Sequence, residues 1–164
     1  MTAPDQWTFL HYGKKHCSHL RKVPLAEVNG TTINMDNKGI LTEFPIKRSV
    51  YEAMIEHCKE SLPNEGCGLL SGKGMTGDSL WKLQNEAHHP NRFHMSVAAI
   101  EQSVQQMASK GETLTGIFHS HPSTPAIPSS HDIANNPYTD VVYLIVSFYK
   151  GEIDVGCFIM EDQQ

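Results

Sequence analysis

The sequence has no long apolar run, no excess of positive charge and no closely paired cysteines, and each absence excludes a class of protein. The longest apolar run, Val141 to Val146, is far too short to cross a bilayer. The formal net charge is −5 with histidines neutral, so no general attraction to nucleic acid or to an anionic membrane is expected. Without a C-x-x-C pair the cysteines are expected to be free thiols. They are Cys17, Cys58, Cys67 and Cys157.

The first residues also lack the marks of a secretory signal. Met1 to Trp7 contains neither a basic region nor an apolar one, so we expect a cytoplasmic protein. Hydrophobic residues make up 39% and charged residues 19% of the chain, which is ordinary for a globular protein. At 164 residues, one domain with a substantial core is the default expectation.

Histidine, in contrast, is abundant, with 10 residues, and one segment brings histidines together with a carboxylate. Gly116 to Asp132 reads G-I-F-H-S-H-P-S-T-P-A-I-P-S-S-H-D. If a strand ends here, His119 and His121 point to the same face, because side chains alternate along a strand. Imidazole nitrogens and the carboxylate of Asp132 are suitable zinc ligands. Two histidines and one aspartate leave one tetrahedral position open, which is typical of a catalytic zinc site.

The residues between these candidate ligands predict a stiff connection. Three prolines fix the backbone and remove hydrogen-bond donors. Ser129 or Ser130 is then expected to cap a short helix with Asp132 in its first turn, where the helix dipole favours a negative charge. The prolines are Pro122, Pro125 and Pro128.

This segment resembles the signature of the JAMM (MPN+) metalloproteases, H-x-H-x(7)-S-x(2)-D, with Ser129 and Asp132 in register. The family also has an upstream glutamate in the setting P-x-E-x-C-G-L-L-x-G, which Pro63 to Gly72 matches with Glu65. Two separate motifs in the right order make chance agreement improbable. The resemblance covers roughly Thr42 to the C-terminus.

The resemblance implies both a fold and a mechanism. The fold is an α/β or α+β domain, with a curved mixed sheet flanked by helices, similar to the cytidine-deaminase architecture. The mechanism uses one zinc ion held by His119, His121 and Asp132. Glu65 then acts as the general base that shuttles a proton, and Ser129 stabilises the oxyanion, while the zinc brings the pKa of its water towards about 7.

The resemblance also implies a class of substrate. No long insertion surrounds the two motifs, so the chain looks like the compact, prokaryotic-type members. Those hydrolyse amide or isopeptide bonds after the Gly-Gly tail of ubiquitin-like proteins, including sulfur carriers. An extended tail of this kind could add as a strand beside a sheet edge.

The first 39 residues lie outside the resemblance, so we predict an N-terminal extension at 1–39 and the metalloprotease domain at 40–164. Asn29-Gly30 between β-formers predicts a hairpin in the extension. A cluster of potential ligands there is either a second metal site or part of an exposed polar extension. The second interpretation is favoured, because the spacing fits no zinc pattern. The cluster is His11, His16, Cys17 and His19.

Periodicity and turn signals predict an order of strands and helices for the domain. Ser49 and Ser96 are expected to cap the two longer helices, the second with Val97, Ile100, Val104 and Met107 on one face. The histidine-rich segment 86–95 is either a polar loop or the wall of a substrate cleft. The predicted strands are 40–46, 67–70, 79–84, 114–119, 141–149 and 152–160, with the last two forming a hairpin.

Four alternatives compete with this function. A non-catalytic scaffold of the same fold is disfavoured by the complete set of motif residues. A cupin-like His-x-His enzyme is disfavoured by the predicted helices, and base deamination by the absence of the P-C-x-x-C element. A thiol nucleophile at Cys67 is disfavoured as well, because its apolar neighbours favour a packing role.

Overall fold

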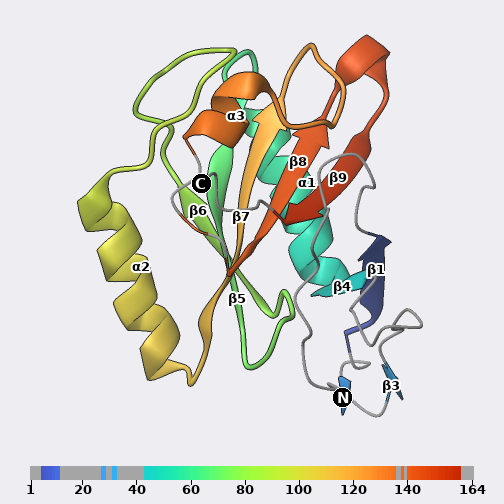
Figure 1. Cartoon of the computed structure of the whole chain (residues 1–164), viewed down its shortest axis with the longest axis vertical. Helices are drawn as coiled ribbons and strands as arrows, with labels where there is room; N and C mark the ends of the chain where they lie inside the picture. Colours follow the sequence, from blue (N-terminus) through green and yellow to red (C-terminus); the bar gives the residue numbers. More distant parts are fainter. Residues whose placement is uncertain are drawn as a thin grey trace.

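The computed structural model describes residues 5–11, 27–28, 31–32, 43–135, 138 and 140–159. Its centre is a five-stranded sheet in the order β6-β5-β7-β8-β9, flanked by helices (Figure 1). The predicted fold class, a mixed sheet flanked by helices, is confirmed. The strands are β5 (Cys67–Gly72), β6 (Ser79–Leu83), β7 (Thr113–His121), β8 (Val142–Ser147) and β9 (Asp154–Ile159), and the helices are α1 (Arg48–Ser61), α2 (Val97–Ser109) and α3 (Ser130–Ala134).

The sheet is mixed because β7 and β8 run parallel, whereas its other neighbouring strands run antiparallel. A parallel pair requires the chain to cross from the end of one strand back to the start of the next. Helix α3 lies in that crossover and is the next element along the chain after β7. The predicted C-terminal hairpin is confirmed by the pairing of β8 with β9.

Because successive side chains of a strand point to opposite faces of the sheet, the core forms two layers, one on each face. On one face, α1 packs Met54 against a buried group that includes Phe118 and Leu144. On the other face, Met107 of α2 packs in a group with Ile117 and Ile145. His119 and His121 share the parity of Ile117 along β7, so they lie on the α2 and α3 face of the sheet.

Gly68, in the motif that follows Glu65, occupies a position where the packing leaves no room for a side chain. A Cβ atom at this position would lie 2.3 Å from the carbonyl oxygen of Trp81 and 2.5 Å from the Phe118 ring. Any side chain here would therefore push Phe118 out of the core or separate β5 from β6. Glycine lets the neighbouring strand and the ring approach closely.

Of the N-terminal residues that the structure describes, residues 7–11 are joined to this domain by strand pairing. β1 (Trp7–His11) pairs antiparallel with β4 (Glu43–Lys47), and Leu10 packs against the core layer under α1. β2 (Glu27–Val28) pairs with β3 (Thr31–Thr32) across the position where Asn-Gly predicts a hairpin. His16, Cys17 and His19 lie outside the described residues. The domain boundary at residue 39 stays a prediction.

Two helix predictions were wrong in detail. Lys47, and not Ser49, is the N-cap of α1; the Ser49 hydroxyl and backbone N–H instead donate to the carboxylate of Asp5. Ser96 does cap α2 as predicted, but Val97 and Val104 are 67% and 40% exposed. The buried stripe of α2 runs through Ser103 and Met107, because the helix meets the sheet mainly along β7.

None of the helices in the described part of the chain combines the length and the apolar character needed to cross a membrane.

Candidate metal centre

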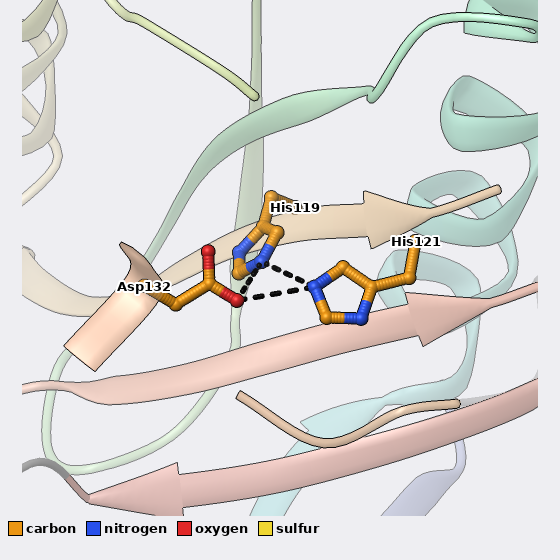
Figure 2. A group of neighbouring side chains, drawn as sticks. All are labelled: His119, His121 and Asp132. Atoms are coloured by element: carbon orange, nitrogen blue, oxygen red, sulfur yellow. Dashed lines mark hydrogen bonds and ion pairs between the residues drawn. The ribbon is translucent and has the colours of Figure 1, made fainter. Parts of the chain in front are cut away.

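Three side chains converge where β7 ends and α3 begins. His119 and His121 point from β7 towards Asp132 of α3 (Figure 2). The Nε2 atoms of the two histidines are 3.2 Å apart, and each lies 3.1 Å from Oδ2 of Asp132. All three side chains are largely buried, with side-chain exposures of 1%, 5% and 8%. The structure therefore brings together the three residues that the sequence predicts as ligands.

This triangle has the dimensions of a metal site. In a tetrahedral zinc site with bonds of about 2.0–2.1 Å, neighbouring ligand atoms lie about 3.3 Å apart. Nδ1 of His121 lies 2.8 Å from the carbonyl oxygen of Pro125, so its N–H can donate there and leave Nε2 free as a ligand. Among the described residues, this trio is the group of His, Cys, Asp and Glu side chains arranged to hold a metal ion.

The local sequence explains why Asp132 reaches the histidines. Ser129 is the N-cap of α3, and its Oγ accepts a hydrogen bond from the Asp132 N–H at 3.0 Å. In return, Oδ2 of Asp132 accepts a hydrogen bond from the Ser129 N–H at 2.9 Å. This reciprocal capping box fixes the Asp132 rotamer with its carboxylate over the end of β7.

The electrostatics of the trio follow from burial and mutual contact. Burial alone would raise the pKa of Asp132, but hydrogen bonds from both histidines hold that pKa far below its usual range. Burial lowers the pKa of His119, which favours the neutral imidazole that binds a metal. Burial also acts to lower the pKa of His121, but its contacts with Asp132 and Pro125 raise the pKa overall.

Glu65 lies beside this trio because of the strand register. Cys67 pairs with His119, and Gly66 exchanges backbone and side-chain hydrogen bonds with Ser120, so Glu65 continues the ladder opposite His121. Residues opposite each other on paired strands share a face of the sheet. Glu65 is only 3% exposed, and its Oε2 has no hydrogen-bond partner among the described residues. Burial raises the pKa of Glu65 to about 8, and a nearby dication would lower it by favouring the carboxylate.

A cavity of about 520 Å³ opens beside the trio on the α2 face of the sheet. His119 and Asp132 form one side, and residues from α2, β7 and β8 form an apolar floor. The volume falls in the range of sites that hold a small molecule or a few residues of a peptide. The floor consists of Ile100, Ile117 and Tyr143.

The histidine-rich segment 86–95, here called the cleft loop, forms another wall of the cavity. Its residues Ala87 and Arg92 to Met95 line the space. The ring of Phe93 stacks on the His119 imidazole, with centroids 4.6 Å apart and an interplanar angle of 19°. Of the two sequence interpretations of this segment, the cleft wall agrees with the geometry. The stacking itself had no sequence signal, because the loop reaches His119 across β5.

The other residues singled out in the sequence, Cys67, Ser129 and His131, are not part of the ligand trio. Cys67 is fully buried, and burial raises the pKa of its thiol to about 12, so it is unsuited to act as a thiolate nucleophile. Ser129 is exposed beside Asp132, with its hydroxyl oxygen accepting the capping bond. His131 is exposed on α3 and lines the cavity, as expected for a neighbour of Asp132 that points elsewhere.

Residues 47–155 match the family described as prokaryotic homologues of the JAB domain. A desampylase from Pyrococcus furiosus is 32% identical over 88 residues, which cover 54% of this chain and 62%, less than two thirds, of that protein. A CysO-cysteine peptidase from Mycobacterium bovis is 26% identical over 112 residues, covering 67% of this chain and 77% of its own. A solution structure from Desulfitobacterium hafniense is similar over 72% of this chain and 92% of its own, with a TM-score of 0.59 and 29% identity.

Proposed function

Because the chain belongs to the family of prokaryotic homologues of the JAB domain, we propose that it is a zinc-dependent hydrolase that cleaves an amide or isopeptide bond. The bond follows the C-terminal Gly-Gly tail of a ubiquitin-like or sulfur-carrier protein. The observation that carries this proposal is the convergence of three ligand atoms within 3.1–3.2 Å of one another, with the buried Glu65 opposite one of the ligands.

The donor set supports zinc as the metal. Two imidazole nitrogens and one carboxylate oxygen suit a borderline ion, and three protein ligands leave a position for a catalytic water. His119, His121 and Asp132 would hold the ion. When bound, zinc supplies a Lewis acid that acidifies water and polarises the scissile carbonyl.

The chain's own residues supply the proton transfers and part of the oxyanion stabilisation. Oε2 of Glu65, buried and unpartnered among the described residues, takes a proton from the attacking water and gives it to the leaving nitrogen. The Ser129 hydroxyl accepts the capping bond through its lone pair, so its hydrogen remains available for the carbonyl oxygen as that atom gains negative charge. The walls of the cavity orient the substrate and keep bulk solvent away from the reacting atoms.

The substrate class is supported by the relatives and by the shape of the site. The similar proteins are named desampylase and CysO-cysteine peptidase, and the second name describes a peptidase that acts on CysO-cysteine. The apolar floor of the cavity fits a side chain next to the scissile bond. Glycine residues at the scissile position pass a crowded site most easily, since they carry no side chain. The cytoplasmic location stays a prediction from the sequence.

The experiment that tests the proposal combines metal analysis with a hydrolysis assay. Purified protein is expected to carry about one zinc per chain, because the structure describes one such trio. It is offered a panel of Gly-Gly-tailed sulfur carriers with C-terminal adducts, and the products are followed by mass spectrometry. Bound zinc without cleavage of any conjugate would favour the non-catalytic scaffold instead.

Ser129→Ala is expected to keep the zinc but to lower kcat by about 10²–10³-fold, the usual cost of removing one oxyanion donor. The same change also removes the cap of α3, which costs about 1 kcal/mol of stability. Ser129→Thr is the matched control, because threonine keeps both the hydroxyl donor and the cap. Full activity in Ser129→Ala would limit Ser129 to capping.

Ile100→Trp tests whether the cavity receives part of the substrate. The larger side chain occupies the floor of the cavity, so KM is expected to rise by on the order of 10-fold or more, with zinc content unchanged. Val104→Trp is the control, because Val104 lies on the same helix, is 40% exposed and does not line the cavity. Equal kinetics in the two variants would exclude the cavity from substrate binding.

A further inference from the structure

We propose that Asn85 is a positioning residue of the candidate site, whose side-chain amide fixes the cleft loop to the backbone of Glu65. This inference rests on the proposed function for its effect on turnover. Its effect on the geometry of the site can be measured without any substrate. Asn85 lies between the end of β6 and the cleft loop, outside both motifs that identify the ligands and the glutamate.

The side-chain amide of Asn85 both donates and accepts hydrogen bonds. Nδ2 donates to the carbonyl oxygen of Glu65 at 3.0 Å and to that of Arg92 at 2.8 Å. Oδ1 accepts from the backbone N–H groups of Ala87 and His94, both at 3.0 Å. A primary amide has two donor hydrogens and two acceptor lone pairs, so Asn85 uses its full capacity. One small side chain thereby joins the start and the end of the cleft loop to the residue proposed as the base.

The backbone of Glu65 is held by Asn85 on one side and by the cleft loop on the other. Its carbonyl oxygen receives the Asn85 bond, and its N–H donates to the carbonyl oxygen of His89 at 3.0 Å. The Glu65 side chain itself makes no such anchoring bond through Oε2. The place of its carboxylate therefore depends on where the loop holds the backbone. A displacement of about 1 Å at a reacting group can cost on the order of 10²-fold in rate.

The cleft loop also orients His119. The outer nitrogen of a ligating histidine usually donates to a carbonyl or carboxylate that fixes the ring. Nδ1 of His119 is buried and has no hydrogen-bond partner among the described residues, unlike Nδ1 of His121. Stacking against Phe93 takes the place of that bond, and Phe93 lies between two of the residues that Asn85 holds, Arg92 and His94. Asn85 thus positions both the base and one ligand.

The first test reads the His119 ring directly, by NMR of histidine-labelled protein without metal. Phe93→Leu removes the stacked ring and defines the chemical shifts of His119 without its ring current. Asn85→Ala is expected to move the His119 resonances towards those values. Asn85→Asp keeps the size of the side chain and one acceptor but loses both donors, and its carboxylate then faces two carbonyl oxygens. This variant is therefore expected to shift the His119 resonances as well. Gln84→Ala, at the exposed neighbouring amide, is the matched control and is expected to leave them in place.

The second test measures kcat with zinc in excess, so that the metal site stays occupied even if a variant binds zinc more weakly. Asn85→Ala is expected to lower kcat by about 10–100-fold, the scale of a misplaced reacting group. Added to Glu65→Gln, the same change is expected to cost much less, because its target is already disabled. A role in global stability alone predicts a lower melting temperature, unchanged His119 shifts and additive losses.

Unchanged His119 resonances together with wild-type kcat in both Asn85 variants would overturn the inference. If the wild-type protein cleaves no conjugate, the proposed function fails, and the NMR comparison still decides whether Asn85 positions the loop.

Discussion

Glu65→Gln is expected to reduce kcat by about 10²-fold or more while the protein keeps its zinc and its affinity for substrate. Glutamine has the size of glutamate and can hydrogen-bond, but it cannot accept the proton of the attacking water. General acid–base catalysis contributes about 10²–10⁴-fold in enzymes. Steady-state kinetics on a Gly-Gly-tailed conjugate measure the loss, and metal analysis of the same sample measures zinc.

The matched control is Glu60→Gln, which makes the same chemical change at an exposed position on α1. It is expected to behave as wild type. Glu65→Gln is also expected to hold an uncleaved conjugate long enough for the complex to be isolated. Normal turnover in Glu65→Gln would mean that the proposed base is wrong, and loss of zinc would mean that Glu65 holds the metal.

His119→Ala and Asp132→Ala are expected to lower zinc affinity by more than about 100-fold and to abolish hydrolysis. Loss of a residue that only supports a ligand typically costs about 10–100-fold, and loss of a ligand should exceed that. Asp132→Ala keeps the bond from the backbone N–H of residue 132 to the Ser129 hydroxyl but removes the carboxylate that both histidines contact. Competition with a chromophoric chelator measures the affinity of each variant.

His88→Ala is the control for these variants, because His88 is an exposed histidine of the cleft loop. Its zinc affinity is expected to equal that of the wild type. Full zinc occupancy in both ligand variants would exclude the trio as the metal site.

The sequence predicts the elements that carry the site, for reasons that are local. His119 and His121 share a face because of strand periodicity, and the Ser129 cap follows from the preference for serine at the N-cap, the residue just before the first turn of a helix. Glu65 is reached through a motif resemblance, and the register of β5 on β7 then gives the physical reason for its place opposite His121.

Contacts across the chain were less accessible to prediction. The stacking of Phe93 on His119 and the bonds of Asn85 depend on how an irregular loop folds back over β5, and a loop without periodicity carries no signal for that path. The failed cap at Ser49 has a similar cause, since Asp5, far away in sequence, takes the hydroxyl. Val97 and Val104 have helical spacing, but packing against β7 selects a stripe that passes beside them.

Other metal chemistries fit the structure less well. The predicted cupin-like alternative requires a β-barrel, whereas the described residues form an open five-stranded sheet with helices on both faces. A thiol-based mechanism is opposed by the burial of Cys67 and the raised pKa of its thiol. The proposed metal-assisted hydrolysis draws on two polar groups near the trio, the buried carboxylate of Glu65 and the Ser129 hydroxyl at the start of α3.

The most direct test of the account is a zinc titration of metal-free protein, followed by cleavage of the panel of Gly-Gly-tailed conjugates. We predict no cleavage without metal and a rise in rate that reaches its plateau at about one zinc per chain, since the structure describes one trio of ligands. Cleavage by metal-free protein in the presence of a chelator, or no cleavage at any zinc concentration, would contradict it.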